Sequence, residues 1–479
     1  MVKLNDKTIK LLFVSVFFVS YMKLDGIRMT TLSYEDPIPV YTVQENRYLL
    51  DKKLNFYRDD PYAVDEHKRD FFKIFITYFG AAADRGRNYL GIEPQEYSQT
   101  SANLPSGSSV QVPLGDIRGR TALIPLVYGS EPEGQSLPDV LMTAKKSLFQ
   151  GYIDENGEVN EAKLIDQNEK LGYMSVNFKY RKKGIRLACD MKFTEDCGFR
   201  LATSVASIKQ SHYNEIKYEG ESSISDPSQD EVKKYFYDEI QNIMISLGRS
   251  FLSDSPRTSI EDIKASLFWR RIFELNINET DSPWDPLLLI PYIELSGSIA
   301  PGASMRGDYI FDSKFGNNQH ASLGFISGMY FDFIDTIYIG GEVGFVHFFK
   351  HAFSDIPIPN SPYQQNLYPF VTNITVSPGS NWHFALKIGS DYFMDAFSVY
   401  AEYVMMEHKQ DTIALVEQDP AFFPEVLAQK TAFKAKVFNI GLTYDLSPNI
   451  TCGFVWQAPV TERGAYKTTT VMFTFSAVL

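Results

Sequence analysis

The chain ends with Tyr466-Lys467-Thr468-Thr469-Thr470-Val471-Met472-Phe473-Thr474-Phe475-Ser476-Ala477-Val478-Leu479, and this stretch indicates the fold. Apolar and more polar residues alternate along it. The apolar positions are Val471, Phe473, Phe475, Ala477 and Leu479, and the more polar positions between them are Thr470, Met472, Thr474 and Ser476. In an extended strand, successive side chains point to opposite faces. The C-terminal stretch is therefore predicted to be a β-strand with two unlike faces.

The same alternation recurs upstream and predicts about twelve strands. A further segment at 71–83 also alternates and could be another strand. In that case the two strands at 173–180 and 184–193 are counted as one long strand at 173–193, and the total number of strands stays at twelve. The stretch 265–275 fits a helix equally well. A range of about ten to fourteen strands covers these choices. The strands are placed near 173–180, 184–193, 199–210, 265–275, 286–299, 320–332, 336–349, 381–391, 396–408, 431–445, 449–458 and 466–479.

The connections between these strands alternate in length, which is typical of an outer-membrane barrel with short periplasmic turns and long outer loops. The sequence therefore predicts an all-β fold: a closed, antiparallel, transmembrane β-barrel with long outer loops. Short turns are expected at Thr194-Glu195-Asp196, Phe333-Ile334-Asp335, Phe393-Met394-Asp395 and Leu446-Ser447-Pro448-Asn449, a loop at 458–465, and longer polar segments at 214–262, 300–318, 353–380 and 411–430.

The two faces of the strands favour a membrane barrel over a soluble β-sandwich or lipocalin-like barrel, which also alternate. One face carries charged and small residues, which suits a wet lumen. The other is apolar and carries aromatic residues towards strand ends, as a membrane girdle would: Phe193, Phe331, Tyr403, Tyr444 and Trp456. The predicted lumen-lining residues are Arg186, Asp190, Lys192, Arg200, Glu294, Asp332, Glu342, Lys387, Glu402 and Asp445. For each of them, a structural ion pair across the interior is the alternative role.

The N-terminus resembles a secretory signal peptide. Lys3, Lys7 and Lys10 precede an apolar run at 11–22, which is shorter than the roughly 20 residues that span a bilayer. Residues 1–25 are therefore predicted to be a signal peptide, an uncleaved anchor being the alternative. Residues 26–70 are expected to be periplasmic, and residues 71–479 to form the barrel.

Two parts of the chain do not follow the strand pattern. Residues 84–172 are polar and weakly periodic, and they are interpreted as a long outer loop, a plug in the lumen or a small subdomain. Residues 229–247 have helical spacing of apolar side chains and predict one amphipathic helix in a loop. That helix either packs on loop residues or forms a lid.

The final strand resembles the sorting signal of outer-membrane barrels, although Leu479 stands where the usual terminal Phe would be. From about residue 265 onwards the chain is also similar to uncharacterised barrel proteins of Gram-negative intracellular bacteria. The stretches that carry this likeness are Leu267-Phe268-Trp269-Arg270-Arg271-Ile272-Phe273-Glu274-Leu275, Ile339-Gly340-Gly341-Glu342-Val343-Gly344-Phe345 and Pro378-Gly379-Ser380-Asn381-Trp382-His383-Phe384. The resemblance implies a location in the bacterial outer membrane and a barrel fold, and it implies no activity.

Two functions remain open for such a barrel. The first is porin-like passage of small solutes through a polar, mixed-charge lumen, with outer-membrane lipids around it. The second is a surface-exposed structural or adhesive barrel without a transport role. The sequence leaves the solute, the binding partner and the oligomeric state open.

Other function classes are disfavoured. A net charge of −13 argues against a nucleic acid partner, which needs cationic surface. No zinc or phosphate motif is seen, and no cofactor, metal or catalytic residue is predicted. An outer-membrane enzyme would need a rim cluster, for which His351 with Ser354 and Asp355 is the one candidate. The sparse cysteines Cys189, Cys197 and Cys452 are expected to be unpaired, a bridge between the first two being the alternative.

Overall fold

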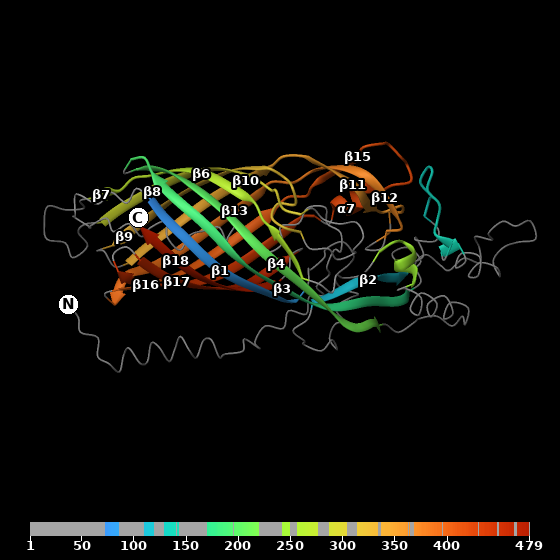
Figure 1. Ribbon diagram of the computed structural model, residues 1–479, viewed down its shortest axis with the longest axis horizontal. Coiled ribbons are helices and arrows are strands. Elements are labelled where there is room, and N and C mark those ends of the chain that lie inside the picture. Colours follow the sequence, from blue (N-terminus) through green and yellow to red (C-terminus); the bar gives the residue numbers. More distant parts are fainter. Residues whose placement is uncertain are drawn as a thin grey trace, which may run out of the picture. The chain divides into compact units, whose positions relative to one another are not determined.

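Twelve antiparallel strands form a closed barrel (Figure 1). The computed structural model describes residues 72–85, 110–118, 129–139, 141–142, 170–194, 196–219, 242–249, 256–275, 287–303, 314–333, 337–362, 364, 368–394, 396–429, 431–447, 450–463 and 467–478. The barrel strands are β1 (Phe72–Arg85), β3 (Lys170–Lys192), β4 (Cys197–Glu219), β6 (Ile263–Arg270), β8 (Leu287–Ile299), β9 (Ser322–Phe333), β10 (Ile337–Phe348), β13 (Asn381–Met394), β14 (Phe397–His408), β16 (Phe433–Ser447), β17 (Ile450–Arg463) and β18 (Lys467–Val478).

The barrel closes because its first strand pairs on both sides. β1 pairs with the last strand, β18, starting at Lys73↔Val478. Its other edge pairs with β3, starting at Phe72↔Met191, and β3 continues the ring to β4. Closure gives each barrel strand a neighbour on both sides, so backbone hydrogen bonds are made within the sheet over the paired length of the strands.

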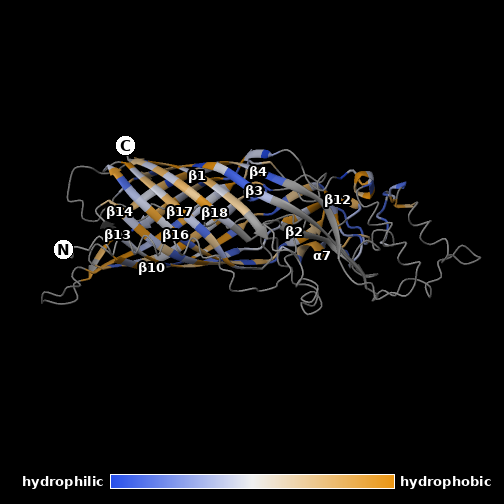
Figure 2. Ribbon diagram, turned by 90° about the horizontal axis from the view of Figure 1, so that it is seen from below, coloured by the Kyte–Doolittle hydropathy of each residue, from blue (hydrophilic) through white to orange (hydrophobic). Residues whose placement is uncertain are grey.

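The faces of the sheet are inverted relative to a soluble protein. Along β10, Ile337, Ile339 and Val343 are 46–48% exposed on the outside, whereas Tyr338 and Glu342 are buried inside. Figure 2 shows the resulting alternation of hydropathy along the strands. Apolar side chains therefore coat the outer surface of the barrel, and its interior holds polar and charged side chains together with buried apolar ones such as Phe79 and Val404.

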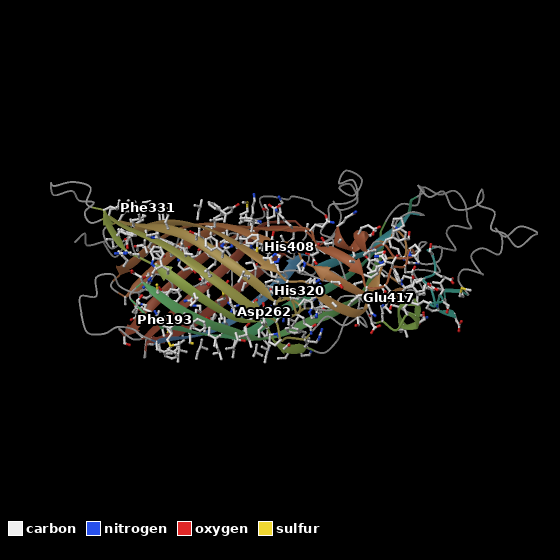
Figure 3. The ribbon with its side chains drawn as sticks, turned by 90° about the horizontal axis from the view of Figure 1, so that it is seen from above. Phe193, Asp262, His320, Phe331, His408 and Glu417 are labelled. Atoms are coloured by element: carbon white, nitrogen blue, oxygen red, sulfur yellow. The ribbon has the colours of Figure 1, made fainter. Side chains whose placement is uncertain are left out.

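The two ends of the barrel differ. At one, here called the turn end, short connections join β3 to β4, β9 to β10, β13 to β14 and β16 to β17, and β18 terminates there. At the opposite end, called the loop end, long connections join β1 to β3, β4 to β6, β8 to β9, β10 to β13 and β14 to β16, and a short one joins β17 to β18. The long connection between β6 and β8 lies at the turn end. Phe193 and Phe331 lie towards the turn end (Figure 3), and Phe193 is 59% exposed. Among the described residues, no helix has the length and apolar character needed to cross a bilayer.

Further elements are built from the long connections. β2 (Val110–Arg118) pairs with β3, β5 (Arg257–Ile260) with β4, and β7 (Phe273–Leu275) with β8. A separate three-stranded sheet, here called the outer sheet, consists of β11 (His351–Ile358), β12 (Phe370–Ser377) and β15 (Thr412–Leu415). The short helix α7 (Pro424–Ala428) lies close to β15.

The predicted strands are found, with corrections to their extent. The alternative assignment is confirmed: the segment 71–83 is a strand, and 173–193 forms one long strand. The placement of two separate strands at 173–180 and 184–193 was therefore wrong. The strand runs on through the basic residues at 181–183 because Lys182 points into the barrel, where the carboxylate of Glu261 compensates its charge. The stretch 265–275 is a strand and not a helix, divided between β6 and β7.

Four predicted loops were wrong in part. The segments 353–380 and 411–430 contain the strands of the outer sheet, and 214–262 contains the end of β4 and all of β5. The predicted loop at 458–465 lies mostly within β17. Proline is tolerated there because, beyond Gln457, β17 pairs only with β16 and its other edge bonds to no strand.

Several predictions fall largely outside the described residues. Of the helix predicted at 229–247, the structure describes a helical segment at 242–246, in which Ile243 and Met244 are buried. Of 84–172, it describes 84–85, 110–118, 129–139, 141–142 and 170–172. The signal peptide at 1–25 and the segment 26–70 lie outside the described residues. All three cysteines are free thiols, as expected.

Candidate functional site: the barrel interior

All ten residues predicted to line the lumen occupy inward positions of the strand register. Their burial separates them into two groups. Six are buried, namely Arg186, Arg200, Glu294, Glu342, Lys387 and Glu402; four, located towards the turn end, are partly exposed, namely Asp190, Lys192, Asp332 and Asp445. The interior therefore presents a buried charged zone away from the turn end.

Ion pairs bring several of these charges together on the wall formed by β3, β4, β6 and β8. Arg200 donates two hydrogen bonds to the carboxylate of Asp190 on the neighbouring strand. Lys264 Nζ lies 3.5 Å from Glu294 Oε1. Such buried pairs offset the cost of removing each charge from water.

A third ion pair on this wall joins two residues that were not predicted from the sequence to line the lumen. Lys182 Nζ lies 2.8 Å from Glu261 Oε1, and both side chains are almost fully buried. Ser204 Oγ donates a 2.6 Å hydrogen bond to the other oxygen, Oε2. This carboxylate therefore connects two strands of the barrel wall.

Glu261 and the adjacent Asp262 both point inward because the chain has an irregularity between β5 and β6. Three residues, 261–263, face two residues of β4, 203–204, between the pairs Val205↔Ile260 and Ala202↔Lys264. This extra residue is a β-bulge, which breaks the alternation of side chains. Two neighbouring carboxylates thereby reach the interior, whereas in a regular strand adjacent side chains point to opposite faces of the sheet.

Inward tyrosines lie over glycines on the part of the barrel wall formed by β8, β9, β10, β13, β14 and β16. Tyr330 faces Gly340 across the strand pair β9–β10, and a Cβ at Gly340 would come within 2.3 Å of the tyrosine ring. The same relation holds for Tyr292 over Gly328, Tyr338 over Gly389 and Tyr400 over Gly441. Glycine is required at these positions because only its missing side chain leaves room for the ring.

This tyrosine wall surrounds charged groups. Lys387 Nζ lies 4.2 Å from the ring centre of Tyr400 and 5.5 Å from that of Tyr338, distances at which cation–π attraction operates. Glu342 accepts a 2.5 Å hydrogen bond from the Tyr292 hydroxyl, and its other oxygen lies 2.8 Å from His383 Nε2. The interior is therefore polar but densely bonded.

A cavity of about 50 Å³ lies within the interior. By volume it accommodates a few water molecules. Its polar lining combines hydroxyls, amides and charges of both signs: Ser204, Ser296, Ser298, Ser322, Asn317, Asn381, Arg186, Asp262 and Lys264. This composition matches a hydrated, mixed-charge space.

One lining residue, Asn317, comes from the connection between β8 and β9. We call Lys314–His320 the mouth loop. The Asn317 backbone N–H donates to Asp262 Oδ1 at 3.0 Å, and its side-chain Nδ2 donates to Ser298 Oγ at 3.2 Å. Lys314, Phe315, Asn318 and His320 are all buried. The mouth loop is therefore folded inward against the barrel wall.

Buried histidines hold the loop end together (Figure 3). His408, the last residue of β14, places Nε2 2.8 Å from Asp411 Oδ1 and Nδ1 2.5 Å from Asn381 Oδ1, and its ring stacks on Phe433. Burial raises the pKa of Asp411 above its usual value, although the hydrogen bonds from His408 and Gly379 oppose the shift. The contribution of Asp411 to stability therefore grows as the pH falls through this raised value.

His320, at the end of the mouth loop, is completely enclosed. Its Nδ1 lies 2.9 Å from the carbonyl oxygen of Phe349, and its ring packs against His351 and Phe353. The pKa of His320 is lowered to about 4, mainly by burial and to a smaller extent by His351, Lys314 and His408, while the hydrogen bond to the Phe349 carbonyl opposes the shift. His320 is therefore neutral at pH 7.

The candidate catalytic cluster does not assemble. Ser354 and Asp355 are exposed, whereas His351 Nε2 lies 3.1 Å from the side-chain oxygen of Gln319. Within the described ranges, no group of three or more histidine, cysteine, aspartate or glutamate side chains is arranged to hold a metal ion.

No protein-family model matches the chain. No curated protein matches it either. Among solved structures, the chain is similar to an outer-membrane channel of Pseudomonas putida F1 at 8% identity, covering 88% of this chain and 99% of that one, with a TM-score of 0.40. The transport unit of the autotransporter AIDA-I from Escherichia coli is 8% identical over 86% of this chain and 91% of its own, with a TM-score of 0.31.

A Pseudomonas aeruginosa FadL homologue is 12% identical over 85% of this chain and 90% of its own, with a TM-score of 0.29. All three neighbours are less than 25% identical to this chain, and their TM-scores lie below 0.5. The assignment of the fold therefore rests on the strand register and the closure of the barrel described above.

Proposed function

We propose that this protein is a bacterial outer-membrane channel through which small polar solutes pass. The observation that carries the proposal is the inverted, closed barrel, which is apolar outside and charged inside. Closed barrels and helices are the structures that satisfy every backbone hydrogen bond in lipid. The exposed apolar surface supports a lipid environment, and the polar interior supports passage of solutes.

The lipid-facing surface has the expected height. On β10, the outward apolar positions run from Ile337 to Phe345, a span of nine residues, which agrees with the roughly 9–11 residues of a tilted transmembrane strand. Outward apolar residues on β13, from Trp382 to Ile388, are 41–52% exposed. Exposing so much apolar surface to water would favour aggregation, whereas lipid accommodates it.

The interior supports selection of solutes by charge. Positive and negative side chains, Arg186, Lys264 and Asp262, line the cavity, and charged side chains in a pore tune which ions cross it. A barrel of this strand number is narrower than the 16–18-stranded porins that leave wide aqueous channels. We therefore propose small solutes and ions as the cargo. The proposal includes no catalytic step and no cofactor.

Conductance in planar lipid bilayers tests this function. We expect single-channel currents from the purified, folded protein, and a shift of the reversal potential in a salt gradient when Glu402→Gln removes a buried inward charge. Glu407→Gln is the matched control, because Glu407 lies on the same strand, is exposed and pairs with Lys434. Absence of current from protein whose folded state is verified would rule out the channel.

A structural or adhesive role is the second candidate, and one observation favours it. The outer sheet is organised by long-range hydrogen bonds: Gln135 Nε2 donates to the Val371 carbonyl at 2.9 Å, and Asn360 Nδ2 to the Ser130 carbonyl at 3.2 Å. Such a platform suits contact with a partner. Whole-cell proteolysis and binding assays on variants lacking parts of the outer sheet would detect this role, and it fails if the sheet is inaccessible and dispensable.

A further inference from the structure

We infer that the mouth loop, Lys314–His320, is a proton-sensitive latch that narrows the interior at neutral pH and is released when His320 is protonated. The inference adds regulation to the proposed channel function. Its consequence for the passage of solutes rests on that proposed function. It stands on three observations: the inward anchoring of the loop, its unfavourable backbone, and the surroundings of His320.

The loop is anchored directly to the interior wall. Asn317 lines the cavity and bonds to Asp262 and to Ser298, which belong to different parts of the wall. Phe315 packs close to Gly302, and the Arg257 guanidinium lies 5.7 Å from the Phe315 ring centre. Release of the loop would therefore remove an amide from the cavity and enlarge the space within the barrel.

The loop backbone opposes this closed arrangement. Gly316, Asn318 and Gln319 have φ values of 61°, 49° and 66°, in the left-handed region that costs non-glycine residues free energy. Such a conformation persists only while surrounding contacts hold it. Loss of one anchoring contact is therefore expected to favour an open loop.

His320 is the contact that responds to protons. Among the groups that face it are Lys314 from its own loop, His351 and the Phe349 carbonyl from the chain after β10, and His408 from β14. Asp411, the nearby carboxylate, is bonded to His408 and not to His320. A proton on His320 would therefore place a positive charge in an enclosed site beside other cationic or ionisable groups.

The size of the response follows from the difference between closed and open loops. In the open loop His320 would have its ordinary pKa of 6.5, and in the closed loop its pKa is about 4. The ratio of open to closed loop then rises by on the order of 30-fold between pH 8 and pH 5, because protons bind the open form more strongly. Acidification opens the latch and alkalinisation closes it.

Two measurements on the full chain test the latch independently. In planar bilayers, we expect conductance to rise from pH 7.5 to pH 5. In detergent micelles, hydrogen exchange read by mass spectrometry should show falling protection of the mouth loop over the same range, after correction for the intrinsic pH dependence of exchange. His320→Gln keeps a side-chain donor for the Phe349 carbonyl and should abolish both changes.

Two further variants complete the design. His347→Gln is the matched control, because His347 is exposed on β10, and it should retain the response. Asp262→Ala removes an anchor of Asn317 and should reduce loop protection already at pH 7.5, which keeps the test available if His320→Gln does not fold.

The outcomes separate the latch from the channel. Equal pH responses of the wild type and His320→Gln would overturn the latch, and so would a mouth loop whose protection does not change with pH in a conducting protein. If no current flows at any pH but loop protection falls with acid in a His320-dependent manner, the latch stands and the channel function fails.

Discussion

The buried pair Lys182–Glu261 provides a quantitative test of how the barrel interior is held together. The two groups lie 2.8 Å apart with side-chain exposures of 4% and 1%. The contact acts as an ion pair and not as a hydrogen bond, because its geometry falls outside hydrogen-bonding limits at Oε1. The other oxygen, Oε2, accepts the Ser204 hydrogen bond at 2.6 Å.

Glu261→Ala leaves a buried ammonium group without this partner. Breaking a buried ion pair from one side costs about 3–5 kcal/mol, and the imperfect geometry places this pair at the lower end. Loss of the acceptor for Ser204 adds about 1 kcal/mol. We therefore expect Glu261→Ala to lower the free energy of unfolding by about 4 kcal/mol. The double variant Lys182→Met/Glu261→Leu removes both charges and should lie within about 1–2 kcal/mol of the wild type.

Urea unfolding in detergent micelles, followed by tryptophan fluorescence, measures these differences. Glu407→Ala removes one member of the exposed pair with Lys434 and serves as the control, with an expected change of at most about 0.5 kcal/mol. The reasoning is refuted if Glu261→Ala costs less than about 1 kcal/mol, or if the double variant is as unstable as the single one.

Three further predictions concern other parts of the barrel. Gly340→Ala places a Cβ against a tyrosine ring and should cost about 1–3 kcal/mol by urea unfolding, whereas Gly341→Ala, with 3.5 Å of clearance, should change little. Between pH 8 and pH 4, the stability of the wild type should fall relative to that of His320→Gln by up to about 3 kcal/mol, because the depressed pKa of about 4 makes the unfolded chain take up a proton before His320 does. Equal pH profiles of the two proteins would contradict this. Leu386→Lys puts a charge on the proposed lipid-facing surface and should cost about 2–4 kcal/mol in vesicles. Val416→Lys changes an exposed side chain just after β15 and should be neutral, and equal effects of the two variants would argue against a lipid environment.

Much of the barrel could be predicted because its rule is local. A strand between lipid and a polar interior must alternate at every second residue, and the stretches around Ile339 and Phe473 show this without knowledge of their neighbours. The ten predicted lumen positions follow from the same periodicity, and the register places each of them inward. Boundaries were less predictable, because pairing can extend a strand through polar residues such as Lys182.

The outer sheet escaped prediction for a related reason. The segments that form it were interpreted as loops from their polar and proline-rich composition. Their strand conformation depends on pairing between distant segments, for example Ile374 with Leu415. Partners so far apart in the chain leave no signal in a short window of sequence.

The sequence by itself therefore determined the kind of surface that each strand presents, and with it the all-β barrel and the side of the wall on which Arg186 or Glu342 lies. Only the tertiary structure decided which charges meet. The bulge that turns both Glu261 and Asp262 inward, and the enclosure of His320 by three separate segments, depend on register and on loop packing. Periodicity is a property of one strand, whereas an ion pair or a buried histidine is a property of several strands at once.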